Sequence, residues 1–176
     1  GKNLFFFLKN RGYQIANSIT EVQQITSGKL AAFLAEEQQA KFSAGRGDEL
    51  VKSTETALQL LKNKKKGMFL MIEGSQIDWG GHGNDTQYII DEMIDFDNAI
   101  GKVLVFARKD RKTLVIITAD HETGGFTING GDLKSGKVDG KFTTGSHTGV
   151  MIPVFAYGPG SEKFSGIYEN NEIFHK

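Results

Sequence analysis

The stretch MIEGSQIDWGGHGND, residues 71–85, places carboxylates and an imidazole at spacings that suit a metal ion. Asp78 and His82 are four residues apart, so either one helical turn or a tight loop could aim both at one ion. Glu73 precedes them, and Gly74 lets the backbone turn sharply between them. Carboxylate oxygens and neutral imidazole nitrogens are ligands of Zn²⁺ and Mg²⁺. A polar turn followed by a helix cap at Asn84 or Asp85 explains the same residues. The stretch alone does not distinguish this turn from a metal site.

Two further segments carry the same residue types beside glycine. TADHETGG contains Asp120 and His121, and GSHTG contains His147. Adjacent side chains of an extended chain point to opposite faces, so Asp120 and His121 converge only if the strand breaks there. The fourth histidine, His175, has no such neighbours and is interpreted as a surface residue.

The elements expected to position these residues are two apolar runs. GMFLMI (67–72) is typical of a strand covered on both faces and leads into Glu73. TLVIITA (113–119) is β-branched and leads into Asp120. Ligands of open parallel sheets bind beyond the carboxyl ends of the strands, which is where these polar residues fall.

The remaining pattern predicts an α/β fold with a mainly parallel sheet flanked by helices. Residues 124–146 are rich in Gly, Lys and Thr, which predicts a small antiparallel excursion or a surface loop. Residues 29–35 suit either a helix or a buried strand. The other predicted elements are a helix over 3–10, strands at 13–16 and 151–158, a short helix capped by Thr20, a helix starting at Asp48 and a long helix from Asn84 to about Lys109.

Composition excludes several classes of protein. The 176 residues contain 21 basic and 21 acidic side chains, so no overall field favours nucleic acid. The absence of cysteine excludes disulfides and thiolate metal sites. No apolar run approaches the ~20 residues of a membrane span. We expect one α/β domain over residues 1–176; both chain ends fall in predicted helices, which indicates a piece of a longer protein.

The segments EGSQIDWGGH, TADHETGG and GSHTG, in this order and spacing, resemble the C-terminal half of the alkaline phosphatases. The resemblance extends over essentially the whole chain and implies two zinc ions and one magnesium ion. The resemblance implies that Trp79 is not itself a metal ligand but lies near the magnesium ion and the phosphate. The implied ligands are Glu73 for magnesium, Asp78, His82 and His147 for one zinc, and Asp120 and His121 for the other.

The resemblance implies hydrolysis of phosphate monoesters through a phosphoserine intermediate in the complete protein. No segment resembles the family's serine motif, so we expect the isolated chain to have little or no activity. The family also implies a periplasmic or extracellular location and often a homodimer. Two alternatives remain: a metal-dependent phosphodiesterase or sulfatase-like relative, and a non-catalytic metal-binding module.

Overall fold

The computed structural model describes residues 3–176, and its contacts group into two compact units. One contains the residues up to Glu73 together with Asp95–Val103, and the other contains Gly74–Ile94 with Leu104–Lys176. The expected helical start of the chain falls partly on residues 1–2, which lie outside the described residues. The interpretation of 1–176 as one domain stays a prediction.

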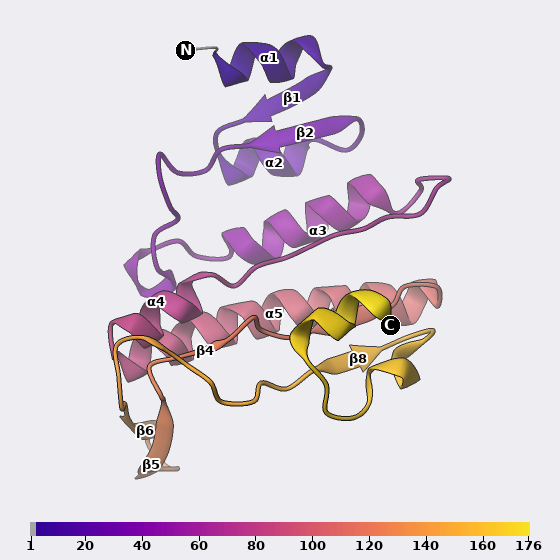
Figure 1. Ribbon diagram of the computed structural model, residues 1–176. Helices are drawn as coiled ribbons and strands as arrows, with labels where there is room; N and C mark the ends of the chain where they lie inside the picture. Colours follow the sequence, from indigo (N-terminus) through magenta and orange to yellow (C-terminus); the bar gives the residue numbers. More distant parts are fainter. Residues whose placement is uncertain (1–2) are drawn as a thin grey trace. The chain divides into compact units, whose positions relative to one another are not determined.

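The first unit begins with a helix–strand–helix–strand segment: α1 (Leu4–Asn10), β1 (Tyr13–Ala16), α2 (Ile19–Gln24) and β2 (Lys29–Ala32). The predicted helix and first strand are confirmed. The ambiguous run after Lys29 forms a strand, which pairs with β1 in parallel, side by side in the same direction (Figure 1). Parallel strands require a crossover connection, and α2 supplies it here.

The cap of α2 differs from the prediction. Ser18, and not Thr20, is the capping residue: its hydroxyl accepts a hydrogen bond from the amide of Glu21 at 3.2 Å. The carboxylate of Glu21 reaches back to the amide of Asn17 at 2.7 Å. The capping residues therefore lie two positions earlier, because Ser18 and Glu21 form a reciprocal arrangement of the capping-box kind.

After a short 3-10 helix η1 (Phe42–Ala44), helix α3 (Glu49–Leu61) follows Asp48 as predicted. The Asp48 carboxylate forms a 2.9 Å ion pair with Lys52 one turn later. Val22 and Leu58 are among the few buried apolar side chains described in this unit.

The predicted strand at 67–72 is absent. The structure assigns no strand there, and Phe69 and Met71 are 91% and 77% exposed. A strand is buried on both faces only when neighbouring strands and covering layers are present. No strand among residues 3–176 pairs with this segment, so its alternate side chains face solvent.

The second unit contains α4 (Gln76–His82) and both ends of the long helix α5 (Thr86–Asp110). Asp85 caps α5 by accepting a hydrogen bond from the amide of Tyr88 at 3.1 Å. Asn84 instead adopts a left-handed conformation with φ of 50° in the connection. The predicted start at Asn84 was therefore wrong by one position, and Asp85, the other residue considered, is the cap.

The strands of the second unit form three small antiparallel pairs among the described residues. The predicted strands at 113–119 and 151–158 shorten to three residues each, and they pair with each other. The predicted antiparallel excursion is present as a hairpin (Figure 1). The pairs are β3 (Val115–Ile117) with β8 (Phe155–Tyr157), β4 (Glu122–Thr123) with β7 (His147–Thr148), and β5 (Thr127–Asp132) with β6 (Lys137–Lys141).

The described residues thus contain helices with one parallel and three antiparallel strand pairs, and the mainly parallel sheet is not seen. Two short 3-10 helices, η2 (Ser161–Phe164) and η3 (Asn170–His175), complete the chain. Among residues 3–176, no helix is both long and apolar enough to cross a bilayer.

Candidate metal centre

Helix α4 decides between the two geometries that the sequence allowed for Asp78 and His82. Both residues lie on this one helix, one turn apart, so their side chains share a face. His82 Nε2 is 3.5 Å from Asp78 Oδ2. A helical turn, not a loop, therefore brings the carboxylate and the imidazole together.

Close packing of two glycines holds α4 against the segment after β4. A Cβ on Gly81 would lie 2.7 Å from the carbonyl oxygen of Thr123, and a Cβ on Gly124 would lie 2.9 Å from the carbonyl oxygen of Gly81. Gly124 also has φ of +95°, a conformation that favours glycine. The two Gly-Gly sequences thus allow the backbone approach that places Asp78 beside Thr123.

The β4–β7 pair brings the other two histidines together. Thr123 is paired with His147, and His121 directly precedes β4. The rings of His121 and His147 stack, with centroids 3.6 Å apart and planes inclined by 19°. Asp78, His121 and His147 each offer a ligand atom within 4.8 Å of the others.

The spacing of Asp78, His82 and His147 is close to that of zinc ligands, with His82 nearer to Oδ2 of Asp78 and His147 nearer to Oδ1. His147 Nε2 is 3.2 Å from His82 Nε2 and 3.8 Å from Asp78 Oδ1. In tetrahedral zinc coordination, bonds of about 2.0–2.1 Å place ligand atoms roughly 3.3 Å apart. One carboxylate and two imidazoles at these separations form a donor set that suits a borderline cation such as zinc.

A carbonyl group orients the His82 ring. His82 Nδ1 is 2.7 Å from the carbonyl oxygen of Gly145, and since a carbonyl only accepts, Nδ1–H must donate. In the neutral ring this leaves the lone pair on Nε2, which faces His147 and Asp78. Metal-binding histidines commonly donate their second N–H in this way.

Thr123, which the sequence interpretation did not include, links Asp78 to His121. Its hydroxyl donates to Asp78 Oδ1 at 2.5 Å and lies 3.2 Å from His121 Nδ1. The hydroxyl has one proton, so the contact with His121 has Nδ1–H as donor and Thr123 as acceptor. Thr123 is two residues after His121, on the same side of the extended chain, and this alternation was the signal available in the sequence.

The remaining predicted residues lie around this cluster or outside the second unit. Asp120 is exposed, and its Oδ2 is 3.3 Å from His121 Nε2. Trp79 lies on α4 with half of its surface exposed. Glu73 is exposed at the end of the first unit. The structure therefore brings together Asp78, His82, His121 and His147, with Asp120 beside His121.

Glu122 is a second residue that the sequence interpretation missed. Burial alone raises the pKa of Glu122, but hydrogen bonds from Thr148 and from the amides of Phe126 and Gly125 outweigh it, together with His121, and lower the pKa below 4.5. The carboxylate therefore stays ionised at neutral pH and acts as an acceptor only.

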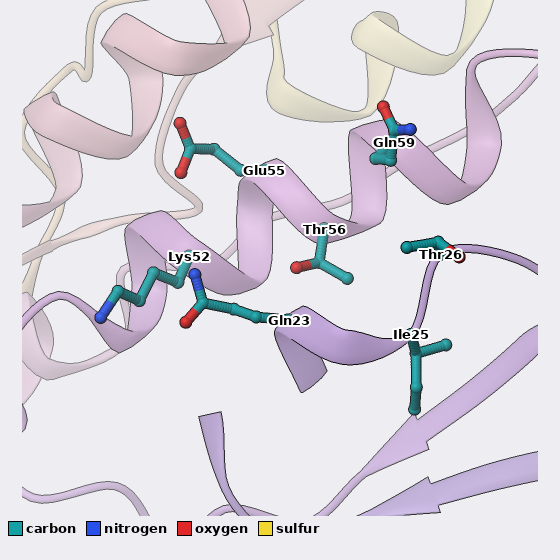
Figure 2. A pocket seen from close by; sticks show the side chains of 7 residues that line it. All are labelled: Gln23, Ile25, Thr26, Lys52, Glu55, Thr56 and Gln59. Atoms are coloured by element: carbon teal, nitrogen blue, oxygen red, sulfur yellow. The ribbon is translucent and has the colours of Figure 1, made fainter. Parts of the chain in front are cut away.

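Other polar features of the first unit are less suited to bind a cation. Arg46 forms a buried 2.8 Å ion pair with Asp95, which occupies its guanidinium. A cavity of about 280 Å³ is lined by α3 side chains, by Gln23 of α2 and by the loop after it (Figure 2). Its lysine, Lys52, is already paired with Asp48, and its carboxylate, Glu55, with Lys102.

Comparisons with known proteins agree on one family. The family model described as alkaline phosphatase matches residues 1–141. The chain is 34% identical over 191 residues to "Alkaline phosphatase 3" of Bacillus subtilis (strain 168), covering 68% of this chain and 41% of that protein. It is 32% identical over 143 residues to the alkaline phosphatase of Escherichia coli (strain K12), covering 72% of this chain and 30% of that protein.

Solved structures agree with this result. The alkaline phosphatase of the Antarctic bacterium TAB5 superimposes with a TM-score of 0.90 at 47% identity, covering 99% of this chain and 53% of that one. A variant of that enzyme, described as having magnesium bound in its M3 site, matches with a TM-score of 0.87 at 44% identity, covering 99% of this chain and 54% of that one. The chain thus spans about a third to half of the length of these relatives.

Proposed function

Because the chain belongs to the alkaline phosphatase family, we propose that it supplies most of the metal ligands of a phosphomonoester hydrolase. The observation that carries this proposal is the convergence of Asp78, His82 and His147 from α4 and β7 at separations of 3.2–3.8 Å. The substrates would be phosphate monoesters, and the product inorganic phosphate.

We assign one zinc ion to Asp78, His82 and His147. The second zinc would be held by Asp120 and His121, whose oxygen and Nε2 atoms face each other at 3.3 Å. Glu73 is assigned to magnesium, and the relative with magnesium in its M3 site supports a role for this ion. Trp79, half exposed on α4, is assigned to the surroundings of magnesium and phosphate.

The metal ions, when bound, would neutralise charge on the transferred phosphoryl group and lower the pKa of an oxygen nucleophile. The protein residues would fix the ion positions. Thr123 and the Gly145 carbonyl hold Asp78 and His82 in orientations that leave ligand atoms free. Phosphoryl transfer depends mainly on such positioning and charge neutralisation.

The nucleophile is proposed to belong to the part of the parent protein that this chain does not span. Ser75 and Ser146 are exposed in the second unit, and the resemblance assigns neither as the nucleophile. We therefore expect the 176-residue chain to hydrolyse phosphate monoesters slowly or not at all with added Zn²⁺ and Mg²⁺. Turnover like that of a full-length alkaline phosphatase would contradict this, and hydrolysis of a diester or sulfate ester instead would favour the alternative enzyme classes.

Zinc titration tests the binding site directly. His147→Ala should lower zinc affinity by more than the roughly 10- to 100-fold that outer partners contribute, because it removes a ligand. His175→Ala is the matched control, since His175 is an exposed histidine outside the cluster. This variant should bind zinc with the affinity of the parent chain. Equal affinities for the two variants would refute the assigned site.

A periplasmic or extracellular location and a homodimer remain proposals based on the family.

A further inference from the structure

Glu122 directly follows His121 and is paired with Thr148, which directly follows His147. Its side chain accepts hydrogen bonds from the amide of Gly125 at 3.1 Å and from the amide of Phe126 at 3.0 Å. It also accepts a short hydrogen bond from the hydroxyl of Thr148. Three donors from two segments of the chain thus converge on one carboxylate.

The hydrogen bond from Thr148 joins the two backbone segments that carry His121 and His147, and the bonds from Gly125 and Phe126 fix the Glu122 carboxylate within its own segment. Glu122 is paired with Thr148 across the β4–β7 ladder, so the side-chain bond reinforces the pairing of the strands. His121 directly precedes Glu122, and His147 directly precedes Thr148. The ladder is two residues long on each strand, so backbone pairing alone constrains it weakly.

We propose that Glu122 is a positioning residue that holds His121 and His147 against each other and thereby couples the two zinc sites. The proposal rests on the proposed function, which assigns His121 and His147 to different zinc ions. Glu122 acts through the strands and touches no substrate. Because the carboxylate is an acceptor only, it can satisfy the Thr148 hydroxyl and the two amides together.

Glutamine separates this role from side-chain volume. Glu122→Gln keeps the shape but turns one acceptor oxygen into an NH₂ donor, so the side chain can no longer accept from Thr148, Gly125 and Phe126 together, because these donors use both oxygens. Thr148→Val removes the hydroxyl at the other end of the bond, and Thr148→Ser retains it as the matched control. If the hydrogen bond between Glu122 and Thr148 positions the histidines, the double variant Glu122→Gln with Thr148→Val should lower zinc affinity little more than either single change does.

The first measurement uses the metal-free chain. Nuclear Overhauser contacts and ring-current shifts between His121 and His147 report the stacked rings, whose centroids are 3.6 Å apart. We expect these signals to weaken in Glu122→Gln and Thr148→Val and to persist in Thr148→Ser. Because this measurement needs no metal, it tests the positioning role of Glu122 even if the chain binds no zinc. Failure of the parent chain to bind zinc would count against the proposed function and not against this role.

The second measurement is zinc affinity, with the visible spectrum of the Co²⁺-substituted chain as a signature of ligand geometry. Glu122→Gln and Thr148→Val should each lower zinc affinity by about tenfold and change the Co²⁺ spectrum, as loss of an outer partner does at metal sites. Thr148→Ser should resemble the parent chain. The proposal is overturned if Glu122→Gln lowers only the melting temperature and leaves the ring contact and the zinc affinity unchanged.

Discussion

At the scale of single residues, the hydroxyl of Thr123 makes the contact that organises the candidate site. It donates to Asp78 Oδ1 and accepts from His121 Nδ1, so it orients a carboxylate and an imidazole assigned to different zinc ions. The Oδ2 atom of Asp78 is thereby left toward His82. An outer partner of this kind fixes the direction of the ligand lone pairs before a metal arrives.

Replacing Thr123 by valine should weaken zinc binding about 10- to 100-fold, because valine has the shape of threonine without its hydroxyl. Serine at the same position should retain most of the affinity. Competition with a chromophoric chelator measures both variants. Tight zinc binding by Thr123→Val would mean that Asp78 and His121 are oriented by other contacts.

The residue types of the site were predictable from the sequence, and their partners were not. Asp78, His82, His121 and His147 stand out because acids and histidines flanked by glycine follow apolar runs. Thr123 and Glu122 lie in the same TADHETGG segment, but their role depends on which strands pair, and the sequence alone does not show that pairing. The grouping of His121 beside His147 likewise follows from β4 and β7, each too short to show a periodic pattern.

At the scale of elements, the acid sensitivity of the β4–β7 pair follows from Glu122. Its pKa is lowered in the folded chain, so the unfolded chain binds the proton more readily. The resulting stability is present above the ordinary pKa of 4.5 and is lost as the pH falls through the lower, folded value.

Urea unfolding at pH values above and below 4.5 measures this dependence. As the pH falls below 4.5, the free energy of unfolding of the parent chain should decrease more steeply than that of Glu122→Gln, whose side chain does not titrate. Glu162→Gln, at an exposed position in η2, is the control and should retain the parent's slope. Parallel curves for the parent chain and Glu122→Gln would contradict the assignment.

Substitutions in the segment 67–72 should change the stability of the chain very little. Phe69 and Met71 are largely exposed, so changing both to serine should alter the free energy of unfolding by no more than about 0.5 kcal/mol each. Leu58→Ala, at a buried position of α3, should cost about 2–5 kcal/mol. If the double variant Phe69→Ser with Met71→Ser loses as much free energy of unfolding as Leu58→Ala does, the segment is buried in solution.

Local signals predicted elements well wherever the elements were stabilised locally. The boundaries of α1, β1 and α5 came close because their caps and apolar periodicity lie within the element. The strand at 67–72 failed because a strand depends on partners distant in sequence, and hydrophobicity cannot show whether a partner is present. For the same reason the mainly parallel sheet was over-predicted, and β3 has only the antiparallel partner β8 among the described residues.

At the scale of the whole molecule, the chain spans 41% of its Bacillus subtilis relative and 53% of the TAB5 enzyme. We propose that metal binding and turnover are separable in this chain. The three ligands assigned to one zinc are present together, whereas the resemblance assigns no nucleophile to these residues.

The most direct test of the proposed zinc site is a crystal structure of the zinc-loaded chain, with the ion located by anomalous scattering at the zinc edge. We expect a zinc ion about 2.0–2.1 Å from Nε2 of His82, Nε2 of His147 and a carboxylate oxygen of Asp78. A zinc ion bound elsewhere while these three side chains make no contact with metal would contradict it.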